Sequence, residues 1–155
     1  MPLNQYVYFA LSSERTAAKE MAAVLGIEPD ETTVRASRLA EPPMPVCHRW
    51  KIVCRAPGRR VDEQVAQVLD RLRPHVGRIA ELARRLDQEG EGHSAVLQVV
   101  RYFNDDECAN NAERSGSNLF GWHLGRDVLE FLDATGAVLD VDEYDLAPDA
   151  PGGQP

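Results

Sequence analysis

The chain has 155 residues and a formal net charge of −8, with 43% hydrophobic and 27% charged residues. This composition is that of an ordinary globular protein, and the length is typical of one domain. No run of about 18 apolar residues occurs, which excludes a membrane-spanning helix, and the start of the chain lacks the pattern of a secretory signal, so we expect a cytoplasmic protein.

The first third of the chain predicts a strand, a helix and a weaker strand. Residues 5–11 alternate between two faces, as a half-buried strand requires. Ser12 and Ser13 offer N-cap oxygens for a helix that Gly26 would end. Residues 31–38 are a weaker strand candidate.

The middle of the chain contains its strongest patterns. Three prolines within residues 39–46 predict a loop. The best strand pattern follows at residues 47–55, and residues 93–103 read as a buried strand. Residues 61–89 form the longest helical pattern, in which Pro74 predicts a kink or the start of a second helix. The apolar seam of this segment indicates one helix face packed on a sheet rather than a coiled coil. The strand residues predicted to face the core are Trp50, Ile52 and Cys54.

The last third predicts a long loop, a helix and a strand. Residues 104–118 are polar, and a loop of this length is typically functional or mobile. An amphipathic helix that buries Val128, Phe131 and Leu132 should end at Gly136. In the final strand Leu139 and Val141 should face one side, and Asp140, Asp142 and Tyr144 the other.

The order of elements is β-α-β-β-α-β followed by α-β. The first six predict a ferredoxin-like core, in which helices cover one face of an antiparallel sheet and the other face stays open. The final helix and strand would be a C-terminal extension of that core. We therefore expect a single α+β domain over residues 1–147, followed by a disordered Pro- and Gly-rich tail at 148–155.

Three stretches carry a resemblance to a known family. They are LGIEPDETTVRASR at residues 25–38, RWKIVCR at 49–55 before a long helix, and HLGRDVLEFLDATGAVLDVDEY at 123–144. In their order and spacing they resemble the bacterial family catalogued as domain of unknown function 4279. The resemblance implies a compact α/β domain of bacterial origin and supplies no established reaction. Some relatives look like immunity-type proteins near toxin genes, which implies a similar role.

No motif predicts catalysis, a metal site or a cofactor. The four histidines lack the helical spacing of a zinc site, and no phosphate-binding or nucleophile motif occurs. Cys47, Cys54 and Cys108 show no C-x-x-C spacing and predict no disulfide framework; Cys54 reads as a core residue. The sequence therefore favours a non-enzymatic protein.

The open face of the sheet is the preferred candidate site. Aromatic and charged side chains should share this face, which suits a protein partner or self-association. Tyrosines beside arginines could also stack RNA bases, but the acidic last strand would repel phosphates, and a pI near 5.0 disfavours nucleic acid. The predicted binding residues are Tyr6, Tyr8, Arg49, Lys51, Arg55, Tyr102, Asp140 and Asp142.

The acidic end of the chain points to the type of partner. Residues 127–155 contain eight acidic residues and no lysine or arginine. A concrete hypothesis is an immunity protein that neutralises a basic, nucleic-acid-directed toxin. The alternative is a small-molecule binder or enzyme that uses a cleft near loop 104–118, with Trp122, His123 and Arg126 as its nearest polar and aromatic groups.

Overall fold

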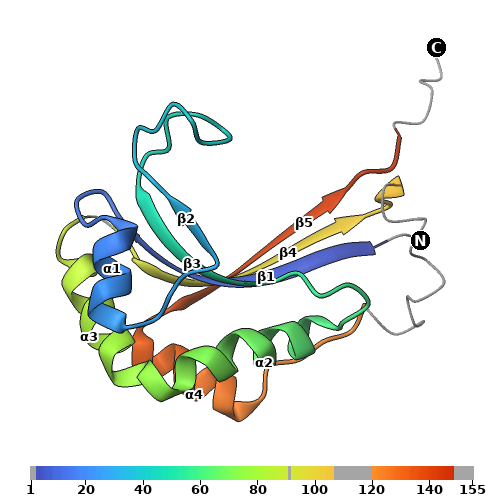
Figure 1. Ribbon diagram of the computed structural model, residues 1–155. Coiled ribbons are helices and arrows are strands. Elements are labelled where there is room, and N and C mark those ends of the chain that lie inside the picture. The colour runs from blue at the N-terminus through green and yellow to red at the C-terminus, as the bar shows by residue number, and fades with distance from the viewer. Residues whose placement is uncertain (1–2, 91, 107–119, 149–155) are drawn as a thin grey trace.

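The computed structural model describes residues 3–90, 92–106 and 120–148. Its centre is a five-stranded sheet in the order β2-β3-β1-β4-β5, with helices on one face only (Figure 1). The mixed α+β class expected from the sequence is thereby confirmed. The strands are β1 (Leu3–Ser13), β2 (Glu31–Thr33), β3 (His48–Cys54), β4 (Ala95–Phe103) and β5 (Val138–Asp145). The helices are α1 (Ala18–Leu25), α2 (Val61–Leu72), the 3-10 helix η1 (Arg73–His75), α3 (Val76–Asp87) and α4 (Arg126–Thr135).

The strand directions differ from a purely antiparallel sheet at one edge. The central strand β1 pairs antiparallel with β3 and β4, and β2 pairs antiparallel with β3. The last strand, β5, pairs in parallel with β4. The reason is the connection through α4, because a strand that returns after a helical crossover runs parallel to the strand it left. The five-stranded order is therefore not that of a simple ferredoxin-like fold.

The helix predicted to start at Ser12 and Ser13 begins later, so that prediction was wrong. Strand β1 continues to Ser13, which lies opposite His48 of β3. The Ser13 hydroxyl instead accepts hydrogen bonds from the backbone N–H groups of Arg15 (3.0 Å) and Thr16 (2.9 Å). It caps a turn, and the pairing of β1 with its neighbour outweighs the local capping preference.

Pro74 breaks the long helical segment, as predicted. Helix α2 ends at Leu72, Pro74 lies in η1, and α3 starts at Val76. The apolar seam of this segment has seven residues. Val76 is half-buried against the core, and the other six are buried in it: Val65, Leu69, Leu72, Ile79, Ala83 and Leu86. The seam packs on the sheet, as expected for one amphipathic helix face.

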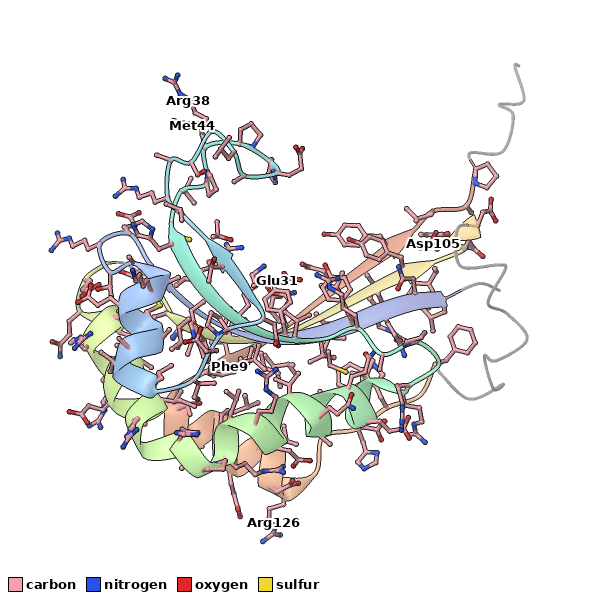
Figure 2. All side chains as sticks on the ribbon, in the orientation of Figure 1. Phe9, Glu31, Arg38, Met44, Asp105 and Arg126 are labelled. Atoms are coloured by element: carbon pink, nitrogen blue, oxygen red, sulfur yellow. The ribbon has the colours of Figure 1, made fainter. Side chains whose placement is uncertain are left out.

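The core lies between the sheet and the helices. The predicted inward side chains of β3, Trp50, Ile52 and Cys54, are all buried. The Trp50 indole N–H donates to the carbonyl of Ile27 at 3.2 Å, which satisfies its one polar group. Figure 2 shows Phe9 on the helix side of the sheet, where it makes an edge-to-face contact with Phe131 at 5.6 Å between ring centroids.

Helix α4 ends at Gly136, as predicted, and this residue has a left-handed φ of 68°. Replacing Gly136 by alanine should cost about 1 kcal/mol of unfolding free energy, because a Cβ is unfavourable in this conformation.

Gly77 lies inside α3, where an added Cβ meets nothing within 4 Å. Gly77→Ala should therefore stabilise the protein by roughly 0.5–1 kcal/mol. Urea titrations of both variants should show these opposite signs; equal signs would contradict the assigned backbone conformations.

Two predicted segments lie mostly or wholly outside the described residues. These are loop 104–118, of which residues 104–106 are described, and the C-terminal tail, of which only residue 148 is described. In the described part of the chain, no helix has the length and apolar character needed to cross a membrane.

Candidate functional site

The face of the sheet that no helix covers, here called the open face, is built by strand register. Side chains of paired residues point to the same side of a sheet. Tyr8 lies opposite Val53 of β3 and Gln98 of β4, and Gln98 lies beside Asp140 of β5. The same register places seven of the eight predicted binding residues on this face: Tyr6, Tyr8, Arg49, Lys51, Tyr102, Asp140 and Asp142. The eighth, Arg55, follows the end of β3 and lies on this face through its contact with the Tyr6 ring.

Tyrosines form the middle of the open face. The rings of Tyr6 and Tyr8 stack at 6.2 Å and 21°, and those of Tyr102 and Tyr144 at 5.1 Å and 17°. Burial raises the pKa of the Tyr6 and Tyr8 phenols, so both are neutral donors and acceptors at physiological pH. Stacked tyrosines provide contact area at a low entropic cost, since few rotatable bonds must be ordered.

Cations line one side of this tyrosine array. The Lys51 ammonium lies 4.4 Å from the centroid of the Tyr8 ring, and the Arg55 guanidinium 4.1 Å from that of Tyr6. Arg55 also bonds Glu31 at 2.9 Å, and this carboxylate raises the pKa of Arg55 against the opposing effect of burial. Burial lowers the pKa of Lys51, and the neighbouring charge of Arg49 adds to that effect. The β3 side of the open face is therefore positive and partly desolvated.

Carboxylates line the other side, along the edge strand β5. Asp142 accepts a hydrogen bond from the Gln98 side chain at 3.1 Å, and Asp140 is exposed. Glu143 and Asp145 lie in the same strand with the opposite orientation. In the part of the chain that the structure describes, no strand pairs with the outer edge of β5. Charged side chains on an edge strand protect it against indiscriminate strand pairing.

The alternative pocket of Trp122, His123 and Arg126 stays a prediction, because most of loop 104–118 lies outside the described residues. Trp122 packs against the core, and His123 is 75% exposed, with its Nδ1 at 3.4 Å from the Asp62 carboxylate. Figure 2 shows Arg126 at the far end of the helical layer, pointing away from the sheet.

A cleft that sequence reasoning missed lies at the opposite edge of the sheet. The loop of residues 34–47 rises above the open face beside β2 and β3 (Figure 1). Between this loop and the strands is a cleft of about 830 Å³, lined by residues between Glu31 and Lys51. The available signal was the clustering of Leu, Met, Val and Pro in a segment predicted to be a loop, since loops without a binding or packing role are usually polar.

Buried polar residues were also missed. Arg101 has only 5% of its side chain exposed and donates to the Gln5 side chain at 3.0 Å and to Glu143 at 3.1 Å. Gln64 of α2 is fully buried and donates to the Gln5 carbonyl at 3.0 Å. The burial of Arg101 could have been predicted from its position in the sequence, because the alternation of β4 places it on the same side of the strand as Val99 and Leu97.

The described residues contain no group of three or more His, Cys, Asp or Glu side chains that could hold a metal ion. His48 accepts a hydrogen bond from the Arg35 backbone N–H through Nδ1 at 3.0 Å, which is a structural contact. Cys54 is buried in the core and Cys47 is half-buried, whereas Cys108 lies outside the described residues.

These features define a mixed α+β domain with a one-sided helical layer and an exposed, charged and aromatic sheet face. A family model described as a domain of unknown function (DUF4279) matches residues 3–146, and the chain belongs to this family. No curated protein matches the chain. No solved structure matches it either.

Proposed function

We propose that the protein is a non-enzymatic binding module that contacts a basic protein through its open face and the acidic edge strand β5. The observation that carries this proposal is the uncovered sheet face, on which stacked tyrosines lie beside a row of carboxylates. Aromatic side chains surrounded by polar groups are typical of protein interfaces. The acidic edge disfavours the RNA-binding alternative, because phosphates would be repelled at Asp140 and Asp142.

We further propose where the protein acts and how its fold is related to a ferredoxin-like core. A bacterial, cytoplasmic immunity protein that neutralises a basic toxin is the concrete form of this function. We also propose that β1 to β4 with α1 to α3 correspond to a ferredoxin-like core, to which α4 and β5 were added. The alternating strand directions across β2, β3, β1 and β4 support this relationship. The open face would also permit self-association, which size-exclusion chromatography with light scattering measures directly.

The test compares two variants with the same change in charge. Asp140→Asn with Asp142→Asn removes the carboxylates of the open face, whereas Glu130→Gln with Asp133→Asn removes two exposed carboxylates of α4, on the helical side. Tagged wild type should retain one stoichiometric basic protein from native lysate at low salt, and lose it as salt rises. With the retained protein purified, the β5 variant should bind it roughly tenfold more weakly than wild type does, and the α4 variant should bind it with unchanged affinity.

Three results would contradict the proposal. The β5 and α4 variants could retain the same proteins to the same extent, the retained protein could be acidic, or no protein could be retained even at low salt. Retention of nucleic acid in place of protein would favour the RNA-binding alternative instead.

A further inference from the structure

The cleft beneath the 34–47 loop combines apolar and cationic side chains. Its upper wall is the loop itself, which Figure 2 shows standing clear of the sheet with Arg38 and Met44 at its outer end. Its floor is the edge of the open face formed by β2 and β3. The volume of about 830 Å³ lies within the range of small-molecule sites.

The loop wall is apolar although it faces solvent. Leu39 is 98% exposed, and Met44 and Val46 are also largely exposed. The loop is held in shape by two backbone hydrogen bonds, from Ala36 N–H to the Pro45 carbonyl and from Met44 N–H to the Ser37 carbonyl, each 2.8 Å long. These hydrogen bonds fix the loop, and its apolar side chains line one cleft, which suits the binding of a hydrocarbon group.

The floor carries two cations that no direct ion pair occupies. Among the residues that the structure describes, Arg49 and Lys51 form no ion pair, and the carboxylate of Glu31, which lies opposite Lys51 in the strand register, is bonded to Arg55. Lys51 is half-buried with its ammonium over the Tyr8 ring. Burial and the charge of Arg49 lower the pKa of Lys51, and the nearby Glu31 carboxylate opposes that shift without reversing it.

We propose that this cleft binds an amphipathic organic carboxylate, whose anionic head lies on Arg49 and Lys51 and whose hydrocarbon body packs against Leu39, Met44 and Val46. Arginine matches the two oxygens of a carboxylate, and a lysine ammonium adds a point charge beside it. Glu31 and Glu41 also line the cleft, so it disfavours a dianion such as inorganic phosphate. The site is independent of the proposed contact at β5, which lies at the opposite edge of the sheet.

The test measures the binding of octanoate, kept below its micelle concentration, by isothermal titration calorimetry and by amide chemical shifts. Octanoate should bind saturably and shift amides of residues 31–51. Three compounds should each bind at least roughly tenfold more weakly than octanoate. Octan-1-ol lacks the negative charge, acetate lacks the hydrocarbon body, and inorganic phosphate carries more than a single negative charge. A short peptide ending in leucine, with and without C-terminal amidation, distinguishes a peptide carboxylate from a free acid as the source.

Variants separate the cleft from the rest of the molecule. Arg49→Gln with Lys51→Gln, and separately Leu39→Ser with Met44→Ser, should each weaken octanoate roughly tenfold. Arg38→Gln removes a charge from the same loop but does not line the cleft, and it should bind like wild type. Asp140→Asn with Asp142→Asn should also bind octanoate normally, whatever the outcome at β5.

The proposal is overturned by any of several outcomes. Wild type could fail to bind octanoate, the Arg49 and Lys51 variant could bind it equally well, or acetate or phosphate could match octanoate. Circular dichroism of each variant shows whether it is folded. If the variant Arg49→Gln with Lys51→Gln unfolds, octanoate binding to Lys51→Met alone measures the contribution of the charge.

Discussion

Replacing Trp50 by alanine is expected to lower the free energy of unfolding by about 3–5 kcal/mol. Trp50 is fully buried at the centre of β3 and is among the largest side chains of the core. Its removal loses apolar contacts with both helices and strands, leaves a cavity, and leaves the Ile27 carbonyl without its indole donor. Equilibrium urea unfolding followed by circular dichroism measures the difference.

Two comparisons make this prediction specific. Trp50→Phe retains most of the apolar volume and should lose only about 1–2 kcal/mol, chiefly because the Ile27 carbonyl loses its partner. Tyr144→Ala removes a ring that is about half exposed on the open face, and should cost less than about 1 kcal/mol. A Trp50→Ala variant as stable as Tyr144→Ala would mean that β3 does not face the core as described.

Replacing Arg101 by methionine is expected to cost about 2–3 kcal/mol, although methionine keeps much of the volume. Arg101 is nearly completely buried on the helix side of β4, where it donates to Gln5, Glu143 and the Phe120 carbonyl. Its planar guanidinium also lies over the Phe103 ring at 5.0 Å. Loss of the donor leaves the buried Gln5 side-chain oxygen unpaired, which costs more than the net contribution of an exposed hydrogen bond.

The control for Arg101 is its ion-pair partner. The Glu143 side chain is half exposed, so Glu143→Gln should cost less than about 1 kcal/mol. If Glu143→Gln were as destabilising as Arg101→Met, the ion pair rather than the buried hydrogen-bond network would be the stabilising feature. Thermal unfolding at low and high salt separates the two, since the contribution of an exposed charge pair falls with ionic strength.

The open face and the loop cleft place different chemistry at the two edges of one sheet. Carboxylates gather on β5, whereas the cations Arg49 and Lys51 lie with apolar side chains and with Glu31 and Glu41 beside β2 and β3. The tyrosines of β1 and β4 lie between the two edges. The two proposed sites therefore lie at opposite edges of one sheet, and the charge-removing variants described above address each edge separately.

Local patterns in the sequence determined the type and order of the helices and strands and the buried faces of the central elements. The alternation around Trp50 predicted an inward face, and the glycine after α4 predicted its end, because strand period and left-handed backbone preference are properties of short segments. The same alternation placed Tyr8, Lys51 and Asp140 among the outward side chains. Pro74 predicted the break between α2 and α3 for the same local reason, its missing N–H and fixed ring.

Only the tertiary structure decided how these segments meet. The parallel pairing of β5 with β4, the extension of β1 to Ser13 and the burial of Arg101 each depend on a partner more than 30 residues away in the chain. The cleft arises because the 34–47 loop folds back over its own strands. Pairing and loop placement are settled by the free energy of long-range contacts, which residue spacing within one segment does not encode.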